Sequence, residues 1–145
     1  MVIALSSPLH VGIYENECLI DSYSMQEQTS ESLPYVFSTL LERYEPKGLF
    51  FARGPGSFMS IKIAYIFLKT MSISLGIPLY ATDGFTFNEG KPIKAMRQRY
   101  FVKEDGNITT RLFESPQESF FSLPNVLLKE VFDSNAEPLY MLPAV

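Results

Sequence analysis

The chain has 145 residues, a length that suits one domain with room for a small appendage and excludes two full-sized domains. Hydrophobic residues make up 46% of the sequence and charged residues 19%, a balance that supports a packed core and excludes intrinsic disorder. The formal net charge of -4 excludes nucleic-acid binding by bulk charge alone, so any RNA contact has to be local.

The first elements expected are three short strands and a helix. Apolar runs at residues 2–5, 11–14 and 18–23 are separated by Ser-Ser-Pro and Glu-Asn-Glu turns, which predicts a three-stranded meander. A helix should follow, capped by Ser30 or Ser32 and with Pro34 in its first turn. Its apolar residues recur with helical spacing at Leu33, Val36, Phe37, Leu40, Leu41 and Tyr44.

The next elements alternate strand, helix and strand. Residues 49–52 are continuously apolar, as in a strand covered on both faces, and residues 58–75 form a long apolar helix that should stop at Gly76. Residues 77–81 complete the pattern as another short strand. The order β-β-β-α-β-α-β predicts an α/β fold, a mixed sheet covered by helices.

The second half is more polar, and its pattern is weaker. A boundary near 84–90 divides the chain into a core of residues 1–85 and a small lobe of residues 86–145. Two strands at 93–103 and 107–113 should form a hairpin around an Asp-Gly turn. A capping box with proline at the first helical position predicts a helix beginning near Ser115, and weak patterns suggest a helix over 126–132 and a strand over 138–142.

The helix at 58–75 is apolar on nearly all sides. On a helical projection at about 100° per residue, large apolar side chains lie close to its two lysines, on the side of the helix that would otherwise be polar. Such a helix is either buried in its own domain or covered by another chain, because monomers rarely expose large apolar patches. Partner burial is the interpretation we carry forward. The interface that it predicts consists of Phe58, Lys62, Tyr65, Ile66, Lys69 and Ile73, with Tyr35 on the neighbouring helix.

A glycine-rich turn joins the buried strand to this helix. Its glycines permit positive φ and close backbone approach, its proline stiffens the bend, and its serine can cap the helix. We call this turn the elbow; its residues are Gly54, Pro55, Gly56 and Ser57. Its amides could bind a phosphate at the helix N-terminus, or the turn could be purely structural. The lysine and hydroxyl spacing of a P-loop is absent from this stretch.

The elbow and its helix resemble a known family. Residues 54–58 followed by Ile61, Lys62 and Ile63 resemble the Gly-Pro-Gly-Ser-Phe-Thr-Gly-Leu/Ile-Arg-Ile signature of the bacterial tRNA threonylcarbamoyladenosine biosynthesis family TsaB, also called YeaZ. Residues 30–31 (Ser-Glu) resemble the family's His-Ser-Glu, and residues 138–141 (Pro-Leu-Tyr-Met) resemble its closing Pro-x-Tyr-Leu. The resemblance covers residues 1 to about 85 well and the remainder poorly.

The resemblance implies an actin-like (ASKHA) fold with a ribonuclease-H-like core and a reduced second lobe. It also implies a non-catalytic subunit, for which we expect no cofactor. The single cysteine independently favours a reducing, cytoplasmic setting. The family pairs with TsaD, the catalytic ATP- and metal-binding subunit, through the first two helices of the core. With the ATPase TsaE, the pair supports transfer of threonylcarbamoyl to adenosine in tRNA. Whether the isolated chain homodimerises through the same face of its second helix stays open.

Several positions depart from the family pattern. Residues 6–8 (Ser-Ser-Pro) replace an Asp-Thr-Ser-like loop, so the acid that would position a metal-bound phosphate is missing there. Met59, Ser60 and Lys62 replace the usual Thr, Gly and Arg. These changes weaken a second hypothesis, in which the chain is a reduced actin-like ATPase or phosphotransferase that holds phosphate at the elbow.

A third hypothesis is RNA binding by the second half. Five of the twelve cationic residues lie within positions 91–103, interleaved with Tyr100 and Phe101. On one strand, alternate residues would present cations and Phe101 on a single face, able to touch an RNA backbone and stack a base. An edge strand guarded by cations explains the same pattern. The RNA contacts assigned by this hypothesis are Lys94, Arg97, Arg99 and Lys103.

Other reactive side chains indicate little chemistry. His10 is the sole histidine, which excludes a paired-histidine zinc helix, and we expect neither a metal ligand nor a catalytic residue. Cys18 is the sole cysteine, so the chain cannot form an internal disulfide, and we expect a packed thiol in a reducing compartment. No basic leader is visible at the N-terminus. The apolar stretch 61–75 is shorter than the roughly 20 residues of a membrane-spanning helix, so we expect no membrane span.

Overall fold

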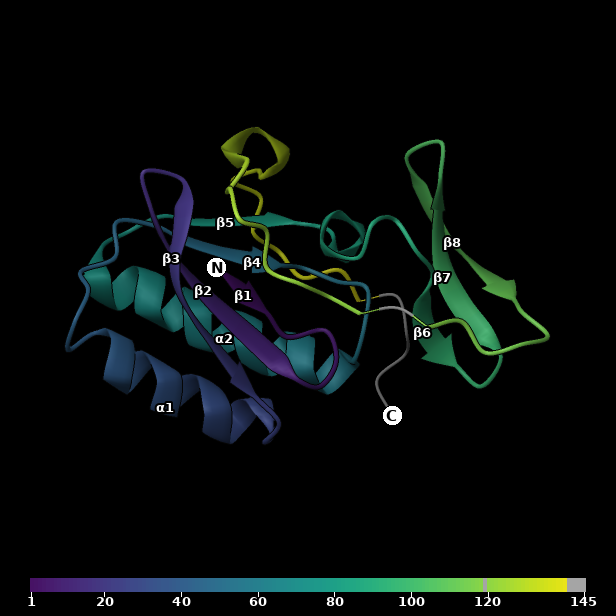
Figure 1. Ribbon diagram of the computed structural model, residues 1–145, viewed down its shortest axis with the longest axis horizontal. Coiled ribbons are helices and arrows are strands. Elements are labelled where there is room, and N and C mark those ends of the chain that lie inside the picture. Colours follow the sequence, from purple (N-terminus) through teal and green to yellow (C-terminus); the bar gives the residue numbers. More distant parts are fainter. Residues whose placement is uncertain (119, 141–145) are drawn as a thin grey trace.

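A five-stranded mixed sheet forms the centre of the molecule in the computed structural model, which describes residues 1–118 and 120–140 (Figure 1). The strands are β1 (Val2–Ile3), β2 (Leu9–Glu15), β3 (Cys18–Met25), β4 (Leu49–Ala52) and β5 (Leu79–Thr82). They lie in the order β3-β2-β1-β4-β5. The first three form the predicted antiparallel meander, whereas β1, β4 and β5 run parallel to one another.

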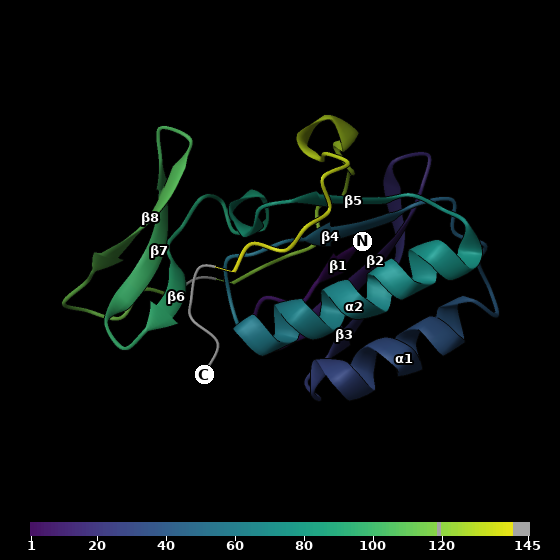
Figure 2. The ribbon, with the colours of Figure 1, turned by 180° about the vertical axis from the view of Figure 1, so that it is seen from behind.

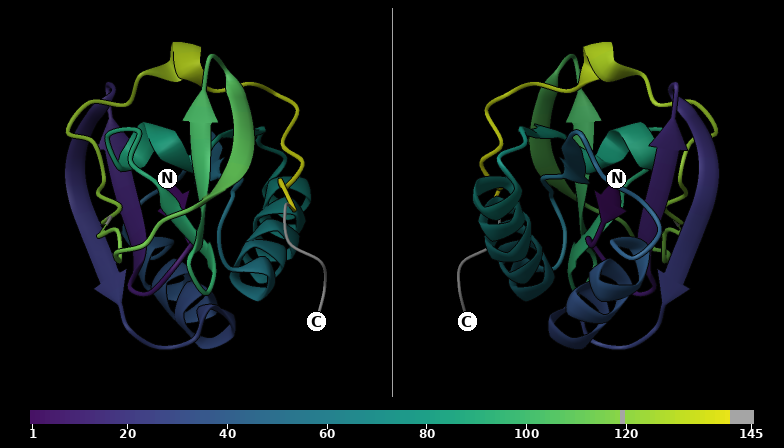
Figure 3. Two further views of the ribbon diagram at one scale, coloured as in Figure 1. Left: turned by 90° about the vertical axis from the view of Figure 1, so that its right-hand side faces the viewer. Right: turned by 90° about the vertical axis from the view of Figure 1, so that its left-hand side faces the viewer.

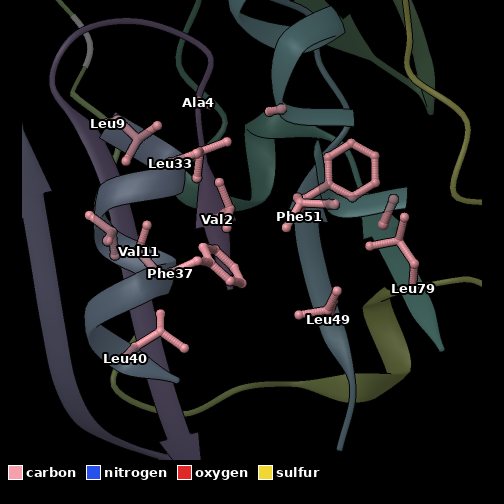
Figure 4. Packing of buried hydrophobic residues seen from close by; sticks show 14 residues of the cluster. Val2, Ala4, Leu9, Val11, Leu33, Phe37, Leu40, Leu49, Phe51 and Leu79 are labelled. Atoms are coloured by element: carbon pink, nitrogen blue, oxygen red, sulfur yellow. The ribbon is translucent and has the colours of Figure 1, made fainter. Parts of the chain in front are cut away.

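Two helices cover one face of this sheet, α1 (Thr29–Leu40) and α2 (Phe58–Leu75) (Figure 2). They pack against each other and lie over the sheet in both end-on views (Figure 3). Between the helices and the sheet lies the main core, whose side chains interdigitate (Figure 4). Its labelled members are Val2, Ala4, Leu9, Val11, Leu33, Phe37, Leu40, Leu49, Phe51 and Leu79.

The start of α1 differs from the prediction. Gln28 is the N-cap residue, and its side chain makes no capping hydrogen bond. Ser32 lies inside the helix and donates its hydroxyl to the carbonyl of Glu27 at 3.1 Å, while Ser30 is an ordinary exposed helical residue. The N-cap residue therefore lies two residues before Ser30 and four residues before Ser32, and Pro34 lies in the second turn rather than the first.

The opposite face of the sheet is crossed by an extended segment, residues 120–140, which we call the strap. It passes over the sheet in Figure 3 and contains only one short 3-10 turn, Lys129–Val131. Phe121, Leu123 and Phe132 of the strap pack on a second core cluster around Ile3 and Leu5. The strap also pairs with both edges of the sheet, through the bridges Cys18↔Val126 and Ala81↔Asp133.

These contacts explain why the helix predicted over 126–132 is wrong. The backbone groups that an α-helix would use internally are instead bonded to the sheet edges, as in Leu127 N to Glu17 O at 2.8 Å. The helix predicted from Ser115 is also wrong, because residues 115–118 are irregular and the amide of Gln117 bonds to the hydroxyl of Tyr100. Residues 138–140 are not a strand, and the rest of that predicted element lies outside the described residues.

A separate three-stranded antiparallel sheet projects from one end of the molecule (Figure 1). A 3-10 turn, Gly84–Phe87, leads to its strands β6 (Ile93–Met96), β7 (Arg99–Glu104) and β8 (Asn107–Leu112). The single strand predicted over 93–103 is therefore two strands, divided by a turn at Arg97, whose φ is 53°. The predicted division of the chain at residues 85/86 stays a prediction, and the strap returns from the second half to the large sheet.

Candidate partner-binding face

The outer surface of α1 and α2 carries exposed apolar side chains. On α2, Ile61, Ala64 and Leu68 point into the core, which leaves the opposite side of the helix to solvent. Ile66 is 53% exposed and Ile73 is 73% exposed. Tyr35 on α1 is 63% exposed, and Lys62 and Lys69 are exposed on α2. The structure therefore brings these five residues to the surface of a two-helix layer.

Met59 belongs to the same surface and was missed by the sequence prediction. It is 57% exposed and stands seven residues before Ile66, which itself stands seven before Ile73. Seven residues are close to two helical turns, so the three side chains form one row. This seven-residue spacing is the sequence signal that could have identified Met59. We call the surface formed by Tyr35, Met59, Lys62, Ile66, Lys69 and Ile73 the helix face.

Two of the predicted interface residues are partly covered by the chain itself. Phe58 is half-buried, and its ring lies 4.7 Å from the ring of Tyr140 at the end of the strap. Tyr65 is also half-buried, with its ring 6.1 Å from that of Phe51. Burial, with a smaller contribution from nearby Tyr65, raises the pKa of the Tyr140 hydroxyl above its usual value. Phe58 and Tyr65 thus border the helix face and are not at its centre.

The elbow is held by the backbone around it. The amide of Ser57 donates to the carbonyl of Leu5 at 2.9 Å, and the carbonyl of Gly54 accepts the amide of Gly84 at 2.8 Å. A side chain at Gly56 would lie 2.7 Å from the Leu5 carbonyl oxygen. Ser57 occupies the N-cap position of α2, but its side chain makes no capping bond, contrary to the prediction.

The strap closes the elbow from the other side. Gly54 has φ of +129°, and a side chain there would lie 2.6 Å from the Leu139 carbonyl oxygen. The amide of Leu139 donates to the carbonyl of Arg53 at 2.8 Å. The Arg53 guanidinium in turn binds Asp133 at 2.7 Å and the Ala81 carbonyl at 2.8 Å. These contacts make the elbow a packed junction of β1, β4 and the strap, which leaves little room for a phosphate.

The basic residues of the second half do not form one face. Arg97 lies in the turn between β6 and β7, and Lys103 is ion-paired with Asp83. Lys94 lies over the ring of Tyr100, 4.9 Å from its centroid, and donates to the carbonyl of Arg97.

Their aromatic neighbours are unavailable as well. Tyr100 and Phe101 are both buried, so neither ring is free to stack on a base, contrary to the pattern expected from sequence. Arg99 is exposed and bonds to the Thr110 hydroxyl at 3.3 Å. The arrangement therefore lacks the stacking platform that the RNA-binding hypothesis needs.

The remaining reactive side chains are dispersed. His10 lies 3.4 Å from the Ser24 hydroxyl, and burial lowers the pKa of its imidazole. Cys18 is exposed at the first residue of β3, so the prediction of a packed thiol is wrong: this strand is an edge of the sheet and its first residues face solvent. Among residues 1–118 and 120–140, no three His, Cys, Asp or Glu side chains are placed to hold a metal ion.

Helix α2 is long and apolar enough to cross a membrane by length and composition alone, which is weak support for a span. The helix connects β4 to β5, and these two strands pair in parallel over four residues. Spanning a bilayer would require breaking that pairing and exposing the core beneath the helix.

Comparison with known proteins supports the resemblance noted in the sequence. The chain is 30% identical over 95 residues to the tRNA threonylcarbamoyladenosine biosynthesis protein TsaB of Buchnera aphidicola subsp. Acyrthosiphon pisum (strain APS). That match covers 61% of this chain and 43% of the relative, so the chain spans less than half of its length. No family model matches the sequence.

Solved structures show the same fold. YeaZ from Pseudomonas aeruginosa superposes with a TM-score of 0.59 at 16% identity, covering 76% of this chain and 61% of that one. A crystal structure of an uncharacterised protein described as similar to the peptidase YeaZ from the same organism gives 0.57 at 15% identity, with the same coverage. The predicted actin-like, ribonuclease-H-like mixed sheet is confirmed. In its matched sequence and in its fold, the chain is TsaB/YeaZ-like.

Proposed function

We propose that this chain is a non-catalytic subunit that binds TsaD through the helix face and thereby supports threonylcarbamoyl transfer to adenosine in tRNA. TsaE joins the larger assembly in this proposal, and tRNA is engaged by the assembly as a whole. The matched relative is named for this biosynthesis. The observation that carries the proposal is the row of exposed Met59, Ile66 and Ile73 on α2, with exposed Tyr35 on the adjoining helix α1.

The chemistry of the helix face fits a helical partner. Its apolar row repeats every seven residues, and Lys62 and Lys69 lie three residues after Met59 and Ile66. This arrangement suits the packing of a second pair of helices along α2, with acidic side chains of the partner meeting the two lysines. Burying each large apolar side chain contributes roughly 1.5–3 kcal/mol to association.

Phosphate binding at the elbow receives less support from the geometry. The Ser57 amide is already bonded to Leu5, and the strap packs against Gly54. Calorimetric titration with Mg-ATP tests this alternative directly, and we expect no micromolar binding.

Co-purification with TsaD tests the proposed interface. Ile66→Glu and Ile73→Glu each place a charge in the apolar row and should weaken binding at least about tenfold. Ile20→Glu is the matched control, because Ile20 is 46% exposed on the edge strand β3, outside both helices, and should bind as the wild type does. If both helix variants retain wild-type affinity, the assignment of the helix face is wrong.

A further inference from the structure

The two edges of the large sheet are blocked against further strands. At β3, the amide of Leu19 is bonded to Asn125 of the strap, and the amide of Ser22 is bonded to the side chain of Asp21. The pairing of β2 with β3 also shifts register between Ile13 and Tyr14. At β5, Ala81 exchanges both backbone hydrogen bonds with Asp133 of the strap. Bulges, charges and covering segments are the devices that natural edge strands use to avoid association.

Strand β8 has no bulge, and its single charged side chain, Arg111, is ion-paired with Glu104 of its own chain. It pairs with β7 over six residues without a register shift, and within the described part of the chain it has no strand on its other side. The opposite edge of the small sheet, β6, is four residues long and its register is interrupted between Lys94 and Met96. Figure 1 shows β8 at the outer rim of the molecule.

The turn before β8 determines which backbone groups face outward. Asp105 and Gly106 have φ of 51° and 80°, as in a two-residue hairpin turn of type I′, so Glu104 and Asn107 form a hydrogen-bonded pair. Hydrogen-bonded and non-hydrogen-bonded pairs alternate along an antiparallel ladder. The N–H and C=O groups of Ile108, Thr110 and Leu112 therefore point away from β7, toward the open edge.

We propose that β8 pairs antiparallel with β8 of a second copy of this chain, about a twofold axis at Thr110. In that register Thr110 faces Thr110 of the second copy, and Ile108 faces Leu112 of the second copy on each side of the axis. All three outward-facing residues then form hydrogen-bonded pairs, and shifting the register by two residues would lose at least one of them.

The side chains are self-complementary in the same register. Ile108 is half-buried and Leu112 is 62% exposed, so their pairing covers the most exposed apolar side chain of the strand. On the other face, Thr109 lies opposite Arg111 of the second copy, which sets no like charges directly against each other. Arg111 already binds Glu104 of its own chain at 2.7 Å, so its charge is balanced within each copy.

The helix face remains free in this dimer. Figures 1 and 2 show β8 on a sheet at one end of the molecule, away from α1 and α2, so pairing at the strand does not cover the helices. The strand pairing and the proposed binding of TsaD are thus independent, and either can fail without the other.

Sedimentation velocity over a concentration series tests the proposal. Thr110→Pro removes an outward N–H and the exposed side-chain bond from Arg99, while leaving the backbone bonds from β8 to β7 in place. Leu112→Lys sets a charge against Ile108 at an exposed site. Each should weaken dimerisation about tenfold or more. The helix-face pair Ile66→Glu and Ile73→Glu should dimerise as the wild type does. Circular dichroism establishes that each variant is folded.

Oxidative cross-linking gives a second readout that survives if Thr110→Pro unfolds. Directly paired residues have Cα atoms about 5.5 Å apart, within disulfide reach, whereas diagonal neighbours lie about 7–8 Å apart. In a Cys18→Ser background, Thr110→Cys should form a disulfide-linked dimer and Thr109→Cys should not.

Three results would overturn the proposal. The first is a wild type that stays monomeric at its highest soluble concentration. The second is a dimer that Leu112→Lys leaves intact and the helix-face variants abolish. The third is equal cross-linking of the cysteine variants at 109 and 110.

Discussion

Substitution of the elbow glycines separates backbone strain from steric contact. Gly54→Ala combines φ of +129° with a side chain 2.6 Å from Leu139 O, whereas Gly56→Ala adds only steric contact with Leu5, closest at its carbonyl oxygen, 2.7 Å away. Gly90→Ala is the matched control, because Gly90 has φ of +72° and nothing within 4 Å of a side chain there. The three variants therefore measure strain with contact, contact alone, and strain alone.

The expected losses of unfolding free energy follow from these distances. Strain alone at Gly90 should cost about 1 kcal/mol. Contact alone at Gly56 should cost about 1–3 kcal/mol, since backbone has to move. Gly54→Ala should cost about 4 kcal/mol, because an unfavourable φ and displacement of the strap add together.

Thermal and urea unfolding measure the three losses. For a chain of this length each kcal/mol lowers the melting temperature by roughly 3–5 °C. If Gly54→Ala is no less stable than Gly90→Ala, the elbow is not packed against the strap and its assignment as a structural junction fails.

Three further predictions concern the core, the strap and pH. Leu68→Ala, at a fully buried site, should lower the unfolding free energy measured in urea by about 2–5 kcal/mol, whereas Ile73→Ala on the helix face should change it by no more than about 0.5 kcal/mol. Similar losses at both sites would refute the burial described for α2. Tyr14→Phe removes the 2.6 Å hydrogen bond to Pro124 O and should lower the unfolding free energy by about 1 kcal/mol. An unchanged unfolding free energy would mean that this bond does not stabilise the strap. Burial lowers the pKa of His10 below 6.5, so the contribution of this side chain to folding stability is complete above pH 6.5 and is lost as pH falls through the lower folded-state pKa. His10→Gln should therefore flatten the pH dependence of the unfolding free energy in that range. An unchanged pH profile in the variant would contradict this assignment.

The sequence determined the first half of the fold because its signals are local. Apolar periodicity set α2 and the β2–β3 meander close to their observed bounds, and Gly76 ended α2 as expected. Two of the three residues in the apolar row on α2, Ile66 and Ile73, were also predicted, since residues seven apart on a helix share a side.

Only the tertiary structure decided the fate of the second half. Ser115 and residues 126–132 carried helical signals, yet the strap is extended because the open edges of the sheet offer its backbone hydrogen bonds that a short, weakly patterned helix cannot match. Tyr100 and Phe101 were expected beside exposed cations and are buried instead, because the hairpin turns both faces of β7 toward other parts of the chain. Contacts between residues distant in sequence determine the conformation of the strap and the burial of Tyr100 and Phe101, and local sequence patterns do not encode those contacts.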